Sequence, residues 1–163
     1  MQVRLLLERL RRAGFLTVDR NGASLTQAGR GNYAPLLRAI KTVRRLGLPA
    51  LIAGPVTLAA LVAHQATRPV WWYRDQAIRE GATALILLRY VGEAWCFLHA
   101  AERLGIQNPL DERVIEEAFP MGDDGNVLAI VSAPDRKRAG AGLWRVINEI
   151  ILLNRHRLLG SLS

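Results

Sequence analysis

Hydrophobic residues recur at helical spacing at the start of the chain. Val3, Leu6, Leu7 and Leu10 fall at i, i+3, i+4 and i+7. This spacing predicts an amphipathic helix over residues 2–13, which Gly14 would end.

Two short β-prone runs follow this helix, at residues 15–18 and 23–25, and the sequence Asp19-Arg20-Asn21-Gly22 separates them. Asn and Gly tolerate the positive φ of a tight turn, so the pattern predicts a β-hairpin. Thr26 is then expected to cap a helix that runs to about Arg45.

The expected helix over residues 33–45 carries an apolar stripe of Leu36, Leu37, Ile40 and Val43. The stripe lies between a basic segment and a domain that has helices of its own, so part of it needs another surface. We expect that surface to be a second copy of the chain, which predicts a homodimer.

From Pro55 onward, the pattern changes to short apolar runs separated by helical pieces. The expected strands are residues 56–63, 82–91, 94–98 and 127–132, and the expected helices are 74–80, 111–118 (capped by Asp111) and a long one from Asp135. Their order, β-α-β-β-α-β followed by a helix, predicts a ferredoxin-like domain with helices on one face of an antiparallel sheet. An all-helical domain is the alternative, because periodicity alone does not classify short apolar runs.

The sequence therefore predicts an α+β protein with two parts. Residues 1–46 would form a basic module of a helix, a hairpin and a linker helix, and residues 47–163 an α/β domain. The stretch 46–63 has no charged residue and resembles a membrane span in outline. Pro49 and Gly54-Pro55 would break a helix there, which favours buried strands over a span.

Charge is distributed unevenly along the chain. Residues 1–45 hold ten basic and two acidic residues (net +8), residues 46–135 six and eleven (net −5), and residues 136–163 six and one (net +5). Clustered Arg and Lys bind phosphates by releasing counterions, so the front of the chain is expected to face a polyanion. A solvated basic face is the alternative.

Little points to catalysis. The single cysteine, Cys96, excludes an intramolecular disulfide and a multi-cysteine zinc site. Cys96 and His99, with Glu93 and Glu102, have helical metal-ligand spacing, but on the expected strand they would not share a face. We therefore predict no catalytic residue, no metal and no cofactor.

The string LLERLRRAGFLTVDRNGASLTQAGR resembles the second half of a winged helix-turn-helix, from recognition helix through wing hairpin to the Leu-Thr-x-x-Gly phrase. The body, with VTLAALVAHQ, RDQAIREGATALILLRYVGEAWCFL and NVLAIVSAPDRKRAGAGLWRVINEI, is similar to an archaeal family that joins such a module to a domain of unknown function. A complete winged helix has two further helices ahead of its recognition helix, where this sequence has Met1.

The resemblance implies a DNA-binding transcriptional regulator. Arg4, Arg11 and Arg12 on the first helix would reach base edges or phosphates, and Arg20 at the hairpin tip would follow the adjacent backbone. Arg136, Lys137 and Arg138, at the start of the last helix, form a weaker candidate site for an anion.

The aromatic residues Trp71, Trp72 and Tyr73 lie beside Arg68 and Arg74 in the sequence. They would stack on a ligand or a base, or else fill a core edge or an oligomer interface.

Taken together, the sequence predicts a cytoplasmic regulator that binds double-stranded DNA as a homodimer, with a small-molecule effector as a further partner and no membrane contact. The alternative is a ligand-sensing or protein-interaction module without autonomous DNA binding.

Overall fold

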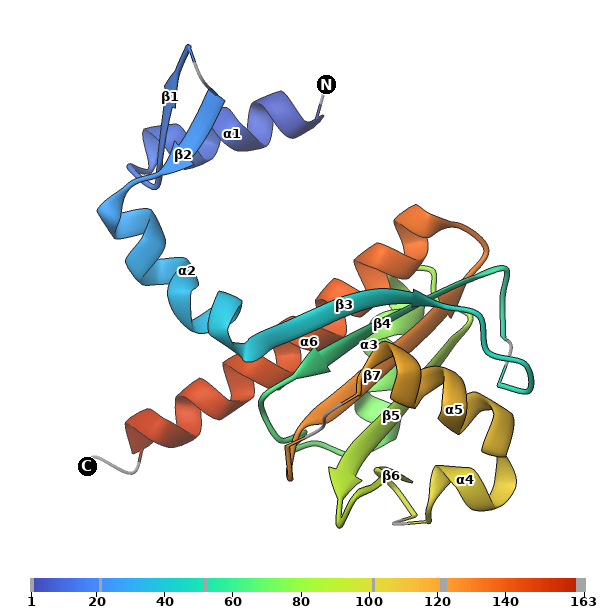
Figure 1. Cartoon of the computed structure of the whole chain (residues 1–163). Coiled ribbons are helices and arrows are strands. Elements are labelled where there is room, and N and C mark those ends of the chain that lie inside the picture. Colours follow the sequence, from blue (N-terminus) through green and yellow to red (C-terminus); the bar gives the residue numbers. More distant parts are fainter. Residues whose placement is uncertain (1, 21, 52, 101, 121–122, 161–163) are drawn as a thin grey trace. The chain divides into compact units, whose positions relative to one another are not determined.

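The computed structural model describes residues 2–20, 22–51, 53–100, 102–120 and 123–160, and for 2–6, 35–37 and 152–160 it describes the backbone alone. The chain divides into two compact units, Met1–Arg38 (unit 1) and Ala39–Ser163 (unit 2) (Figure 1). The fold is α+β. The division falls eight residues before the boundary expected after residue 46.

Unit 1 has the predicted element order of a helix, a hairpin and a helix: α1 (Gln2–Arg12), β1 (Leu16–Asp19), β2 (Gly22–Leu25) and α2 (Gln27–Ala39). Gly14 ends α1 with a φ of 76°. The amide of Phe15 donates to the carbonyl of Leu10 at 2.9 Å, and the amide of Gly14 to that of Arg11 at 3.0 Å. These two bonds form a Schellman motif, in which glycine takes the left-handed position without strain.

The start of α2 explains the Leu-Thr-x-x-Gly phrase. The Thr26 hydroxyl accepts a hydrogen bond from the amide of Gly29 at 3.0 Å and donates one to the carbonyl of Gly14 at 2.6 Å. A Cβ on Gly29 would overlap the backbone carbonyl of Phe15. Thr26 thus caps the helix as predicted, and Gly29 permits α2 to lie directly against the turn after α1.

The helix expected to reach Arg45 ends at Ala39, and Ile40–Leu46 forms strand β3. This part of the prediction is wrong. Ile40, Thr42 and Val43 are β-branched, a residue type that favours strands, and β3 pairs antiparallel with β4. The expected stripe therefore does not lie on one helix. The side chains of Leu36 and Leu37 lie outside the described residues.

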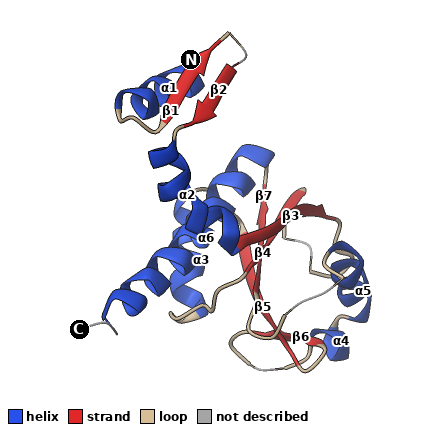
Figure 2. Ribbon diagram, turned by 60° about the vertical axis from the view of Figure 1, so that its left-hand side comes forward, coloured by secondary structure: helices blue, strands red, loops and turns tan. Residues whose placement is uncertain are grey.

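Unit 2 is built on a five-stranded sheet in which all neighbours are antiparallel, in the order β3-β4-β7-β5-β6 (Figure 2). Its remaining elements are β4 (Val56–Val62), α3 (Val70–Arg79), β5 (Ala84–Val91), β6 (Ala94–Phe97), α4 (Leu104–Gln107), α5 (Pro109–Ala118), β7 (Val127–Ala133) and α6 (Arg136–Gly160). Each of the four strands predicted from residue 56 onward has its counterpart.

The strand order differs from that of a ferredoxin-like sheet. Strands β4 and β5 flank β7 and are joined through α3, which makes a split βαβ unit. In the ferredoxin-like arrangement the inserted strand is the third of the four, whereas here it is the fourth, and β6 lies at the edge. Strand β3 adds a fifth strand at the opposite edge.

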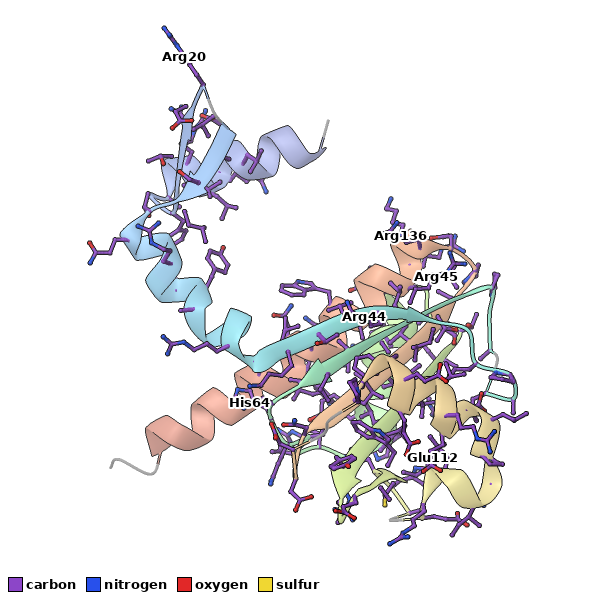
Figure 3. All side chains as sticks on the ribbon, in the orientation of Figure 1. Arg20, Arg44, Arg45, His64, Glu112 and Arg136 are labelled. Atoms are coloured by element: carbon purple, nitrogen blue, oxygen red, sulfur yellow. The ribbon has the colours of Figure 1, made fainter. Side chains whose placement is uncertain are left out.

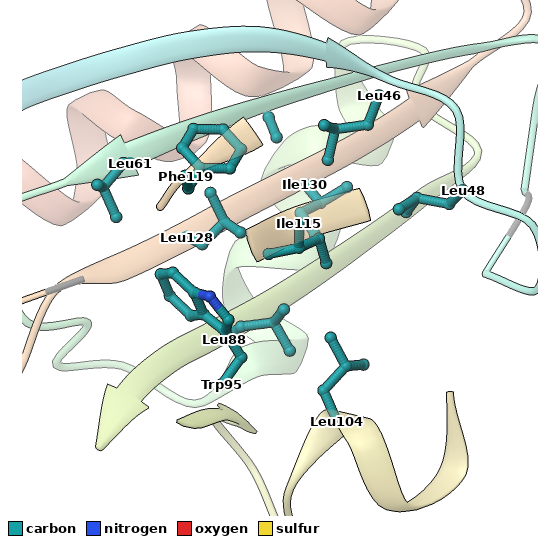
Figure 4. Close-up of a cluster of buried hydrophobic side chains, with 11 residues drawn as sticks. Leu46, Leu48, Leu61, Leu88, Trp95, Leu104, Ile115, Phe119, Leu128 and Ile130 are labelled. Carbon is teal, nitrogen blue, oxygen red and sulfur yellow. The ribbon is translucent and has the colours of Figure 1, made fainter. Parts of the chain in front are cut away.

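Helices cover both faces of the sheet, whereas the sequence predicted one covered face. Helix α6 contacts β4 and β7, and α3 contacts β5, while α5 contacts β3 and α4 contacts β6. On the α4–α5 face, Leu104, Ile115 and Phe119 pack against Leu88 and Leu128 of the sheet (Figure 4). All seven residues of the central strand β7 are consequently buried, as expected for a strand between two helical layers.

Asp111 was expected to cap the helix of residues 111–118, but the helix begins at Pro109, two residues earlier. The buried Asp111 carboxylate instead accepts hydrogen bonds from the amides of Ala50 (3.1 Å) and Leu51 (3.0 Å). It therefore ties the loop after β3 to α5.

The uncharged stretch 46–63 contains the end of β3, a loop and β4. Across the residues that the structure describes, none of the helices combines the length and the apolar character needed to cross a membrane.

Candidate nucleic-acid interface

The predicted arginines of α1 are exposed at its C-terminal half, and they share one carboxylate. Arg11 donates to Glu8 from Nε (3.2 Å) and Nη2 (3.0 Å), and Arg12 donates from Nε at 3.1 Å. These bonds hold the pKa of the Glu8 carboxyl below its usual value, and the bond to Glu8 raises the pKa of Arg11. Two cations and one anion leave this turn with a net positive charge.

Arg4 lies one helical turn before Glu8 on α1, so its backbone position places it on the same side of the helix. Its side chain lies outside the described residues. Arg9 is also exposed on this helix, although the sequence prediction did not include it.

Arg20 occupies the tip of the hairpin and extends away from both strands (Figure 3). The register pairs Asp19 with Gly22, which leaves Arg20 and Asn21 as the two-residue loop; Asn21 lies outside the described residues. A cation at the tip of a short hairpin is accessible to a phosphate group.

The second predicted cluster, at the start of α6, already has an anion. The Asp135 carboxylate accepts from the amide of Arg138 at 2.9 Å and lies 3.5 Å from the Nε of Arg138. Asp135 thus caps α6, and one of the three predicted cations folds back onto the cap. Lys137 is exposed.

Arg136 also belongs to another cluster of arginines, whose other members lie on β3. Together with Arg44 and Arg45 of β3 it lines a hollow of about 360 Å³ in unit 2, and Figure 3 shows Arg45 and Arg136 close together. This group was not predicted from the sequence, because residues 33–45, which include Arg44 and Arg45, were expected to form a helix. The β-branched residues Ile40, Thr42 and Val43 just before them were the signal that could have placed them on a strand.

The residues weighed as metal ligands are not assembled. Cys96 is buried on β6, and His99 follows that strand and is exposed. Among the described residues, no three His, Cys, Asp or Glu side chains come together as a metal site would require. What unit 1 can do chemically is to bind anions through exposed guanidinium groups.

Comparison with known proteins bears on the fold. No protein-family model matches the chain, and no curated protein matches it. A solved structure, the hypothetical protein PH0730 from Pyrococcus horikoshii OT3, is similar with a TM-score of 0.69 and 20% sequence identity. The match covers 91% of this chain and 76% of that one. The two chains therefore share a fold.

Proposed function

We propose that the chain is a cytoplasmic DNA-binding transcriptional regulator. In this proposal unit 1 is the winged-helix-like reader, and unit 2 senses an effector or mediates assembly. The observation that carries it is the placement of Arg11, Arg12 and Arg20 on a helix and a hairpin tip that correspond to the recognition helix and wing of such a module.

The arrangement on α1 suggests how binding would proceed. Glu8 holds Arg11 and Arg12 in the absence of DNA. These ion pairs are exposed to solvent and therefore weak, so a duplex phosphate can replace the carboxylate without a large cost. Arg20 would contribute an independent phosphate contact from the wing.

The decisive test is a salt titration of DNA affinity, measured by fluorescence anisotropy of a labelled duplex. Each neutralised phosphate is expected to contribute a slope of about −0.9 to the plot of log K against log salt. A protein that shows no binding even at low salt would contradict the proposal.

Single substitutions locate the interface. Arg20→Ala is expected to weaken binding to all duplexes about equally and to reduce the salt slope by about 1. Arg113→Ala removes an exposed arginine from α5 of unit 2 and serves as the matched control. Equal losses in both variants would show that net charge, not the hairpin, drives binding.

Glu8→Gln tests the role assigned to the shared carboxylate. Its removal frees Arg11 and Arg12, so affinity for DNA should rise. Glu116→Gln makes the same charge change at an exposed position of α5 and should raise affinity much less. A loss of affinity in Glu8→Gln would mean that Glu8 orients the arginines for binding.

The proposal includes a homodimer, because a dimer doubles the phosphate contacts and matches a two-fold symmetric site. Light scattering at micromolar concentration tests this part, and a monomeric mass would contradict it. A second candidate function, a sensing module without autonomous DNA binding, is favoured by the hollow of unit 2 that Arg68, Arg74 and Arg89 line.

A further inference from the structure

A hollow in unit 2 lies at the N-terminal end of α3. It has a volume of about 730 Å³ and lies between the segment before α3, strand β5 and the segment that follows β6. This volume falls within the range of small-molecule sites, about 300–1,000 Å³.

Arg89 of β5 lines this hollow and has a buried polar atom in its side chain. Its Nε is buried and has no hydrogen-bond partner in the part of the chain that the structure describes. A buried guanidinium nitrogen without a partner is costly. Because Arg89 also lines the hollow, an anion that binds the rest of its guanidinium there would stabilise this partly buried cation.

Two further arginines line the same hollow, Arg68 before α3 and Arg74 in its first half. The described residues that line it include no Asp or Glu. Helix α3 begins after Pro69 without a side-chain cap, so the positive end of its dipole adds to the field of the three guanidinium groups. The Nε of Arg74 lies 3.7 Å from the Asp75 carboxylate, an exposed ion pair outside the lining that a bound anion can replace.

The wall of the hollow is held in place from behind. The buried Tyr73 hydroxyl accepts hydrogen bonds from the amides of Thr67 (3.1 Å) and Arg68 (3.2 Å). These bonds fix the segment that carries Arg68 to the helix that carries Arg74. The backbone positions from which Arg68 and Arg74 extend are therefore set before a ligand arrives, which lowers the entropic cost of binding.

Apart from Thr67 and His99, the rest of the lining is apolar. Leu85 and Leu98 line the hollow, and so does Trp71, whose side chain is 56% exposed. Neighbouring Trp72 instead packs edge-on against Tyr73, with ring centroids 5.5 Å apart. Trp71 thus offers an aromatic face next to the cationic end of the site.

We infer that this hollow binds a small organic anion, whose carboxylate or phosphate group is held by Arg89, Arg74 and Arg68 and whose apolar or planar body packs against Trp71 and Leu85. Guanidinium groups form bidentate bonds with both head groups. Binding of an anion in this hollow does not depend on the proposed function. The further role of that anion as an effector of DNA binding rests on the proposed function.

Calorimetric titration of the full chain, without DNA, tests the inference. The probes are 3-phenylpropionate and AMP, each with a neutral counterpart of the same shape, 3-phenylpropanamide and adenosine. At least one anion is expected to bind at least about tenfold more tightly than its counterpart, because a charge-assisted hydrogen bond is lost in the neutral molecule. Which anion binds distinguishes a carboxylate site from a phosphate site. Absence of binding by both anions up to about 10 mM, or equal binding of the neutral molecules, would overturn the inference.

Variants of the same protein assign the residues. Arg89→Met keeps an unbranched chain of similar reach and removes the guanidinium, so the affinity for the anion should fall at least about tenfold. Because the variant also removes an unpaired buried nitrogen, the Tm of the ligand-free protein should rise by about 2–4 °C. A purely structural role of Arg89 would lower the Tm instead.

Arg74→Ala provides a variant whose folding is not at risk, since its side chain is 56% exposed. It should weaken anion binding, whereas Arg79→Ala, on the same helix but outside the hollow, should not. Unchanged affinity in both Arg89→Met and Arg74→Ala would overturn the site. Because no DNA is present, these results are independent of the DNA-binding tests.

Discussion

Units 1 and 2 are stabilised by different interactions. Among the described side chains of unit 1, Leu16 is the one hydrophobic side chain that is buried, and the unit is held by the Gly14 turn, the Thr26 cap and the hairpin. In unit 2 the strand β7 is buried along its whole length. Stability should therefore concentrate in unit 2, and unit 1 should open more readily, as is common for segments that contact a partner.

The largest expected effect comes from truncating a core side chain in each unit. Leu128→Ala, at a fully buried position of β7, should lower the free energy of unfolding by about 2–5 kcal/mol. All four tryptophans, at positions 71, 72, 95 and 144, lie in unit 2, so urea unfolding followed by tryptophan fluorescence reports on that unit. Leu16→Ala should leave this transition almost unchanged. A large shift in Leu16→Ala would show that the two units unfold together.

A pair of glycines in α2 tests unit 1 in the same way. Gly29→Ala places a Cβ on the carbonyl of Phe15, whereas a Cβ on Gly31 meets nothing within 4 Å. Overpacking costs about 1–3 kcal/mol, while Gly→Ala in a free helix position gains up to about 1 kcal/mol.

Hydrogen exchange measured by mass spectrometry separates the outcomes. Peptides from residues 1–38 should lose protection in Gly29→Ala and gain it in Gly31→Ala, while peptides from unit 2 stay the same. Equal behaviour of the two variants would contradict the packing of α2 against the turn after α1.

The hairpin and the sheet contain the same kind of cross-strand pair in two environments. Thr17 and Ser24 share a hydrogen bond of 3.0 Å on the exposed hairpin, and Thr57 and Ser132 share one of 2.9 Å inside unit 2. Double-mutant cycles with Thr→Val and Ser→Ala should give a coupling of about 1 kcal/mol for the buried pair and less for the exposed one. Equal couplings would show that burial does not strengthen this interaction.

Sequence patterns identified most elements because their ends are marked by residues with a clear conformational role. Gly14 and Thr26 bound the two helices of unit 1, and β7 reads as a short continuous apolar run. Strand β3 was missed because Ile40 and Val43 also continue the helical spacing that starts at Leu36. Residues 40–46 are compatible with both the helical and the strand periodicity. Pairing with β4, which is a contact between residues distant in sequence, favours the strand.

The candidate sites were predictable only where residues close together in the sequence define them. Local sequence was sufficient to place Arg20 at a hairpin tip, because the turn is encoded by its own residues. The hollow in unit 2 was not predictable, since Arg68, Arg74 and Arg89 come from a loop, a helix and a strand. Arg89 lies within an apolar run and had no local feature that marked it as a ligand-binding residue.

The smallest expected effect is a pH dependence of α1. Hydrogen bonds from Arg11 and Arg12 lower the pKa of Glu8 in the folded chain. A carboxyl whose pKa is lower in the folded state stabilises that state above its unfolded pKa, about 4.3 for glutamate, and loses this contribution as pH falls through the folded pKa. Protection of α1 amides should thus decrease slightly on acidification, and less so in Glu8→Gln. Because the ion pairs are exposed, high salt should reduce the effect.

Protonation of Glu8 also frees both arginines, so DNA affinity should rise over the pH range in which α1 loses protection. If DNA affinity and amide protection of α1 fell together, the competition between Glu8 and phosphate would be contradicted.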